Sequence, residues 1–432
     1  MFKSITISGK ERRREMNRFF TKGIMILLAI SFILVGCSSS DNEDSEESTG
    51  NETKDNGQTA SERESEGSAE PQELTFWTFQ GIHIDFFEDA EKRWNEENPD
   101  RPISLKTESF PYDEMHNNLL LALQSGTGAP DIVDIEINRF PNFIQGDIQL
   151  EPLNDLVEPE MESFVQSRFE VYGTDGQYYG LPTHVGASVA FYNKQIFEEA
   201  GVSPDDIETY DDFVEVGKVI KEETGKPMMP VFTNGFWSFY PMISQYDSDF
   251  FDSNGEVILD NEKNTEVLQF LYDLVYEHEI GELAPGGKHD AEEFFAYMND
   301  GGAASLIMPS WYASRFVEYM PDQAGNMVMK PMPAWEEGGN RSAGMGGTGT
   351  AVTNQADNIE LAKDFLAFAK LTEESNIQIW KLLGFDPSRH DIWDSPELRE
   401  PNEFTEYFGE GLFDMLIEIK DEINPLNITK DT

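Results

Sequence analysis

The stretch between Leu74 and Ile135 decides the fold, and it reads LTFWTFQGIHIDFFEDAEKRWNEENPDRPISLKTESFPYDEMHNNLLLALQSGTGAPDIVDI. Short apolar runs predict three strands, at 74–77, 103–106 and 131–135. Helical periodicity predicts two helices between them, at 84–98 and 112–125. A β-α-β-α-β order implies parallel strands with helices on both faces of the sheet, so the fold class is α/β.

The same alternation continues through the rest of the chain. Two further strands and three further helices are predicted, at 189–192 and 303–308, and at 210–224, 264–278 and 358–371. No similarity recurs at a period of about 20 to 50 residues, which argues against a solenoid. Of the 432 residues, 39% are hydrophobic and 12% are aromatic, which is enough apolar material for two or three packed domains.

Charge and cysteine content exclude several classes of function. Lysine and arginine total 31 against 82 acidic residues, which gives a formal net charge of −51. A folded part this acidic repels nucleic acid and anionic lipid headgroups, so neither is expected as a ligand. Cys37 is the single cysteine, which excludes an intramolecular disulfide bond and a cysteine-rich metal site.

The N-terminal segment is predicted to be an export signal. Basic residues precede an apolar run at 24–35 that is too short to span a bilayer as a stable helix. Residues 34–37 read Leu-Val-Gly-Cys and resemble the bacterial lipobox, which predicts a signal peptide over 1–36 and a lipid on Cys37. An ordinary signal peptide with a chance cysteine is the alternative. Met16 is the expected true start of translation.

A tether is predicted to follow the signal. Between Ser38 and Glu73 the chain has no aromatic and no large aliphatic side chain, so it has nothing with which to form a core. Its many like charges keep such a segment extended. Residues 37–73 are therefore expected to be a lipid anchor followed by a disordered acidic linker, behind which the folded part begins.

The usual catalytic motifs are missing. The sequence has no P-loop, no HExxH and no Gly-x-Ser-x-Gly. Residues 344–349 match GxGxxG but lead into the strand-like run 350–353, whereas dinucleotide binding requires a helix there. The six histidines include no i,i+4 pair, which argues against catalytic zinc. We expect no cofactor, no metal and no enzymatic activity, but chance pairs among so many carboxylates leave a glycoside hydrolase open.

Three tryptophans carry the most useful signal. Trp77 ends the first predicted strand, Trp237 lies in an aromatic loop, and Trp311 follows the predicted strand at 303–308. Each ring could simply belong to the core. Their shared position at strand-to-loop junctions instead favours a ligand site, because flat aromatic rings suit the apolar C–H faces of sugars.

Four stretches give the chain a family resemblance: Leu74–Phe79, Leu123–Ile132 with Asn138–Phe140, Tyr179–Lys194 and Glu360–Phe365. They resemble the sugar-binding members of extracellular solute-binding protein family 1, which serve ABC importers. Further motifs, such as Ser-Phe-Pro-Tyr-Asp113 and Gly384-Phe-Asp-Pro-Ser-Arg389, are similar to arabino-oligosaccharide-binding members. The resemblance implies a two-lobed, periplasmic-binding-protein-like fold of type II, with the ligand in a cleft between the lobes.

The resemblance also implies where the lobes and the site lie. It assigns residues 74–183 plus 345–390 to the first lobe and 184–344 plus 391–432 to the second, with crossings near 182–187, 344–350 and His390. The hinge residues carried over are Pro182, Gly344, Gly346 and Gly347. The sugar-binding residues carried over are Trp77, Phe79, Gln80, Glu136, Asn138, Arg139, His184, Trp237, Trp311 and Tyr312.

Together these features predict a monomeric lipoprotein on the extracytoplasmic face of a bacterial membrane. It would bind an oligosaccharide, best described as an arabino-oligosaccharide, and deliver it to the permease subunits of an ABC importer. A secreted glycoside hydrolase and a receptor for a non-sugar solute are the alternatives. Because family members generally continue into one or two more helices, the C-terminus at Thr432 is expected to be truncated.

Overall fold

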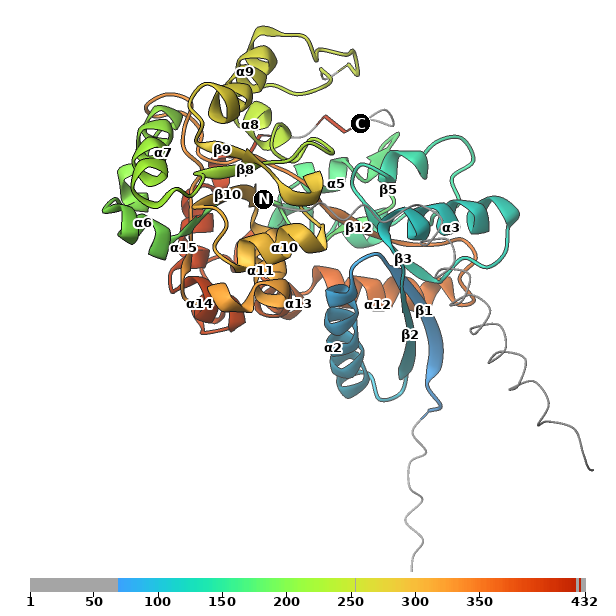
Figure 1. Cartoon of the computed structure of the whole chain (residues 1–432). Helices are drawn as coiled ribbons and strands as arrows, with labels where there is room; N and C mark the ends of the chain where they lie inside the picture. The colour runs from blue at the N-terminus through green and yellow to red at the C-terminus, as the bar shows by residue number, and fades with distance from the viewer. Residues whose placement is uncertain (1–68, 253, 425–426, 429–432) are drawn as a thin grey trace, which may run out of the picture. The chain divides into compact units, whose positions relative to one another are not determined.

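The computed structural model describes residues 69–252, 254–424 and 427–428 (Figure 1). The predicted signal peptide, Cys37 and nearly all of the predicted linker lie outside these residues. Among the residues described, no helix has both the length and the apolar character needed to cross a membrane. Every helix and strand named in the sequence analysis is present within three residues of its predicted ends, and the helices at 112–125 and 210–224 match α3 and α7 to the residue.

The first lobe is built on a five-stranded sheet with the order β2-β1-β3-β12-β6. Strands β1, β2 and β3 are parallel, as predicted, but β12 runs antiparallel to both β3 and β6. β12 has this opposite direction because β6 leads out to the other lobe and β12 returns from it. The strands are β1 (Gln72–Thr78), β2 (Ile103–Ser109), β3 (Ile132–Glu136), β6 (Leu181–Pro182) and β12 (Thr348–Val352), with a hairpin of β4 (Gly173–Thr174) and β5 (Gln177–Tyr178).

Helices cover both faces of this sheet because its buried strands alternate their side chains between two apolar layers. On β3, Ile132 packs in the layer formed with α2 and α12, whereas Val133 and Ile135 pack in the layer formed with α3. Figure 1 shows α2 and α3 on opposite sides of β1 and β3. The helices are α2 (Gly81–Glu97), α3 (Tyr112–Ser125), α4 (Asn154–Val157), α5 (Ser167–Glu170), α12 (Ile359–Leu371) and α13 (Glu373–Gln378), which continues as a π-helical turn over Ile379–Leu383.

The second lobe repeats this layered plan around an antiparallel sheet with the order β10-β7-β11. Val189 and Phe191 of β7 face one apolar cluster, and Ala190 and Tyr192 face the other. The strands are β7 (Ser188–Asn193), β8 (Met229–Val231), β9 (Gly281–Leu283), β10 (Ser305–Pro309) and β11 (Met327–Lys330), of which β8 and β9 form a separate parallel pair. The helices are α6 (Lys194–Ala200), α7 (Tyr210–Thr224), α8 (Tyr240–Gln245), α9 (Glu262–Tyr276), α10 (Glu292–Asn299), α11 (Ala313–Tyr319), α14 (Glu403–Phe408) and α15 (Leu412–Glu418).

Three chain segments connect the lobes and pair with one another. The first joins β6 to β7 over residues 183–187, and the second leads from β11 into β12. They are linked by the backbone hydrogen bond from Met345 N to Gly186 O, at 2.9 Å. The third follows the π-helical turn, and its Asp386 O accepts a hydrogen bond from Val185 N, also at 2.9 Å. The lobes are thus joined by a hydrogen-bonded ribbon of three strands, whereas the exact lobe boundaries given above stay a prediction.

Candidate functional site

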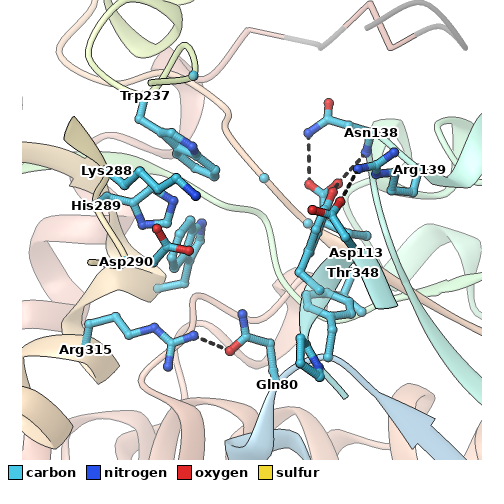
Figure 2. A pocket seen from close by; sticks show the side chains of 18 of the residues that line it. Gln80, Asp113, Asn138, Arg139, Trp237, Lys288, His289, Asp290, Arg315 and Thr348 are labelled. Carbon is cyan, nitrogen blue, oxygen red and sulfur yellow. Dashed lines mark hydrogen bonds and ion pairs between the residues drawn. The ribbon is translucent and has the colours of Figure 1, made fainter. Parts of the chain in front are cut away.

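A cavity of about 850 Å³ lies between the two lobes and is lined by both of them (Figure 2). One wall comes from the first lobe, at the ends of β1 and β3 and the start of α3. The opposite wall comes from the second lobe, at the loop before α8, the loop before α10 and the start of α11. The floor is made by the connecting segments, including His184 and residues 346–348.

Glu136 organises the first-lobe wall. It is the last residue of β3, and its side chain is almost fully buried. One carboxylate oxygen accepts hydrogen bonds from the Tyr112 hydroxyl at 2.8 Å and from Asn138 N at 2.9 Å, and the other accepts from Asn138 Nδ2 at 2.9 Å. Burial raises the pKa of Glu136 to about 7, although these hydrogen bonds act in the opposite direction. The carboxyl therefore titrates close to neutral pH.

The start of α3 completes the same wall. Arg139 Nη2 contacts Asp113 Oδ1 at 2.6 Å, and the guanidinium lies over the Tyr112 ring at 5.3 Å from its centre. Arg139 is partly exposed and Asp113 is largely exposed, so the pair contributes little to stability and remains open to a ligand. His116 Nε2 accepts from Glu136 N, so its Nδ1 donates to Tyr112 O at 2.7 Å. Burial lowers the pKa of His116 to about 4, which keeps this link between α3 and β3 neutral.

The second-lobe wall is aromatic. Trp237 and Trp311 meet edge to face, with ring centres 5.7 Å apart, and both rings contact His289. Both tryptophans are half-buried, so each has one part in the core and another facing the cavity. Trp311 Nε1 donates to Met345 O at 3.3 Å, which ties this ring to the second connecting segment. Burial lowers the pKa of His289 to about 4, so the imidazole beside the two indoles is neutral at physiological pH.

Ionisable groups lie buried beneath the floor. Asp134 Oδ2 accepts from His83 Nδ1 at 2.8 Å, and Lys370 Nζ donates to Thr183 Oγ1 at 2.6 Å. Burial alone would raise the pKa of Asp134, but His83 and Lys370 lower it overall, so the carboxylate is ionised. Burial lowers the pKa of Lys370 to about 8 and that of His184 well below its usual value. The first connecting segment is thus held to the first lobe by a buried amine.

The glycines expected at the hinge are required for close approach. Gly346 has φ of +73°, and a Cβ there would lie 2.9 Å from Trp311 Nε1. A Cβ on Gly347 would lie 2.6 Å from the Tyr172 hydroxyl. Arg168 Nη2 donates to Gly346 O at 2.8 Å and fixes this segment against the first lobe. Gly344 pairs with Ala187 in the ribbon, and Pro182 lies in β6.

Eight of the ten predicted sugar-binding residues line the cavity: Phe79, Gln80, Glu136, Asn138, Arg139, His184, Trp237 and Trp311. Trp77 and Tyr312 do not, which corrects their expected placement. Trp77 precedes the end of β1, and its ring packs edge-on against Phe110 on the α3 side of the sheet. Tyr312 is fully buried in the second-lobe core, where its hydroxyl donates to His289 O at 2.5 Å.

Several residues that line the cavity were not predicted from the sequence: His83, Tyr112, Asp113, Lys288, His289, Asp290 and Arg315. Tyr112 and Asp113 belong to the motif Ser-Phe-Pro-Tyr-Asp113, which resembles arabino-oligosaccharide-binding proteins, so the sequence held a signal for them. The others lie on a helix or on loops whose approach to the cavity depends on the tertiary fold. Among the residues described, no group of three or more histidine, cysteine, aspartate or glutamate side chains is arranged to hold a metal ion.

Comparisons with known proteins agree with this architecture. The arabinooligosaccharide-binding protein of Halalkalibacterium halodurans is 60% identical over 360 residues, which are 83% of this chain and 81% of that protein. The arabinooligosaccharide-binding protein of Bacillus subtilis is 46% identical over 411 residues, which are 94% of this chain and 89% of that protein.

A solved structure shares the fold at lower identity. The ABC transporter associated binding protein of B. animalis subsp. lactis, in complex with beta-1,6-galactobiose, matches with a TM-score of 0.69 and 20% identity. The match covers 83% of this chain and 88% of that one. The sequence pattern described as bacterial extracellular solute-binding protein matches residues 84–375. By this match and by the high identity of its relatives, the chain belongs to the bacterial extracellular solute-binding protein family.

Proposed function

We propose that this protein is the receptor of an ABC importer, that it binds an arabino-oligosaccharide in the cavity between its lobes, and that it delivers this ligand to membrane permease subunits. One observation carries the proposal: the half-buried pair Trp237 and Trp311 faces a wall of hydrogen-bonding groups around Glu136 and Asn138. The names of the two relatives with 60% and 46% identity support the choice of sugar.

The two walls suit the two sides of a sugar ring. Indole faces pack against apolar C–H groups, and the geometry of such contacts adds to the buried area. Asn138 and Arg139 can donate hydrogen bonds to pairs of sugar hydroxyl groups, and the Glu136 carboxylate can accept hydrogen bonds from such hydroxyl groups. Because the walls belong to different lobes, a ligand contacts both of them only when the lobes are closed. Binding therefore shifts the population toward the closed state, which the permease can distinguish from the open one.

The placement in the cell is part of the proposal. Family members are extracellular solute-binding proteins, and we infer that this one is held at the membrane by a lipid on Cys37. The acidic segment 38–73 then serves as the tether that lets the folded part reach the permease. Cys37 and all but the last five residues of this segment lie outside the residues that the structure describes, and both features rest on the sequence.

Calorimetric titration of the folded part tests the proposed ligand. Linear arabino-oligosaccharides of three to six units should bind, whereas malto- and xylo-oligosaccharides of the same length should bind at least about tenfold more weakly. Absence of binding by the arabino series, or equal binding of all three series, would refute the proposed ligand. The same incubations, analysed for released reducing sugar, test the hydrolase alternative, since a receptor returns its ligand unchanged.

A further inference from the structure

Among the described residues, one hydrogen bond joins a side chain of the first-lobe wall to a side chain of the second-lobe wall. Arg315, on α11 of the second lobe, donates a hydrogen bond from Nη2 to Oε1 of Gln80, on the first lobe (Figure 2). Gln80 immediately precedes α2, where β1 ends. At the other end of the cavity, within the described residues, no hydrogen bond or ion pair joins Asn138 or Arg139 to the loop that carries Trp237.

The chemistry of this contact fixes the orientation of the Gln80 amide. A guanidinium has only donors, so it must face the amide oxygen and cannot face the amide nitrogen. The Nε2 group, with two N–H donors, then points into the cavity, as Figure 2 shows. Arg315 is itself held in place, because its Nη1 lies 3.3 Å from Glu318 Oε2 and its guanidinium lies over the Tyr319 ring.

The contact between Arg315 and Gln80 also restricts the path that an oligosaccharide can take through the cavity. Side chains that meet across the gap occupy the path along which a longer chain would leave the cavity at this end. We propose that the Arg315–Gln80 bridge closes one end of the cavity, so that an oligosaccharide binds by one terminus and its other terminus extends past Trp237. In this arrangement Gln80 contacts an oxygen acceptor of the terminal sugar, and Arg315 is a positioning residue that acts through Gln80.

This inference rests on the proposed function, and it assigns a polarity to the same site. It predicts that a bulky group on one terminus of the ligand blocks binding, whereas the same group on the other terminus is tolerated. A cavity open at both ends would accept both modifications. Binding of the unmodified oligosaccharide depends on the proposed function alone, so the two ideas can fail separately.

The experiment uses linear arabinotetraose in three forms: unmodified, with an aminobenzamide group on the reducing terminus, and with an aromatic ether on the non-reducing terminus. Dissociation constants are measured for the unaltered protein, for Arg315→Met and for the control Arg101→Met. Arg101 pairs with Asp364 on the first-lobe surface and does not line the cavity. Thermal melting of each variant checks that it is folded.

The unaltered protein should bind one modified form about a hundredfold more weakly than the unmodified sugar, and the other form within about threefold. Arg315→Met should recover at least about tenfold of the lost affinity, and Arg101→Met should recover none. Tolerance of both modified forms, exclusion of both, or an unchanged preference in Arg315→Met would overturn the proposal. If unmodified arabinotetraose does not bind the unaltered protein, the proposed function fails instead.

Discussion

At the scale of single residues, two kinds of side chain line the cavity: half-buried aromatic rings, and polar groups that are oriented by buried partners. Trp311 illustrates the first kind, because the rest of the second-lobe core supports it from behind. Glu136 illustrates the second kind, because Tyr112 and Asn138 occupy both of its oxygens before any ligand arrives. Residues of these two kinds respond differently to substitution, which makes their roles separable.

Trp311→Ala should weaken oligosaccharide binding about ten- to a hundredfold, because a ring that contacts the ligand is lost. The matched control is Trp380→Ala, since Trp380 is 1% exposed, packs from the π-helical turn into the apolar cluster of the second lobe, and does not line the cavity. That substitution should cost about 3–5 kcal/mol of stability and leave the affinity of the folded molecules unchanged. Calorimetry and thermal melting of both variants decide the matter. A larger stability loss for Trp311→Ala than for Trp380→Ala, with unchanged affinity, would contradict the ligand role.

Glu136→Gln should alter how stability depends on pH. The pKa of Glu136 is about 7 in the folded state and near 4.5 in the unfolded state. Between these two pH values the carboxyl keeps its proton in the folded state and loses it in the unfolded state. The free energy of unfolding therefore falls as the pH rises from about 4.5 to 7, by at most about 3 kcal/mol. Glutamine cannot ionise, so the free energy of unfolding of the Glu136→Gln variant should fall less steeply over this interval. Denaturant titrations at several pH values measure both slopes, and equal slopes would refute the assignment.

At the scale of elements, the second connecting segment does two things. It carries the chain back to the first lobe, and it supplies part of the surface against which Trp311 rests. Glycine at position 346 serves both, since the left-handed backbone and the lack of a Cβ are each needed there. A side chain at position 346 would therefore have two separate effects: it would strain the left-handed backbone, and its Cβ would press against Trp311.

Gly346→Ala should destabilise the protein and also weaken ligand binding, because the new methyl group displaces Trp311. Gly126→Ala is the matched control: Gly126 ends α3 with the same φ of +73°, and a Cβ there meets no atom within 4 Å. The control should therefore lose about 1 kcal/mol through backbone strain alone, with unchanged affinity. Melting curves and titrations of both variants test this. Equal effects of the two substitutions on both quantities would show that the contact with Trp311 is unimportant.

The sequence predicted regular elements well because their periodicity is local. It did not predict that β12 runs against the other strands of this sheet, since β12 reaches β3 from more than two hundred residues away. For the site, strand ends and tryptophans were informative, and eight of ten residues line the cavity. Trp77 was misplaced because it lies within β1, before the strand end that reaches the cavity, and its ring packs against Phe110. Arg315 could not be found, because only the packing of α11 brings it to Gln80.

At the scale of the whole molecule, charge and attachment are properties of the complete chain. The formal net charge of −51 favours solubility and disfavours contact with anionic surfaces, including the membrane to which the protein is proposed to be attached. The proposed lipid and acidic tether would reconcile these features, because they would hold the folded part near the bilayer without requiring it to touch lipid.

Cys37→Ser should release the protein into the medium or leave it as an unprocessed precursor, because serine has no thiol to acylate. The acidic linker offers the matched control: Ser38→Ala changes the neighbouring residue and should leave the protein in the membrane fraction. Immunoblots of cell, membrane and medium fractions measure the distribution. A Cys37→Ser variant that is still processed and membrane-bound like its parent would rule out the lipid anchor.

The order of strands in the first-lobe sheet has a consequence for biogenesis. β12 lies between β3 and β6, so the strand at Thr348–Val352 must be inserted before this sheet is complete. The second-lobe core in turn includes side chains of α14 and α15, near the end of the chain. A chain that emerges from its N-terminus therefore cannot finish either lobe until most of it has been synthesised. This late completion delays the folding of both lobes until almost the whole chain is available.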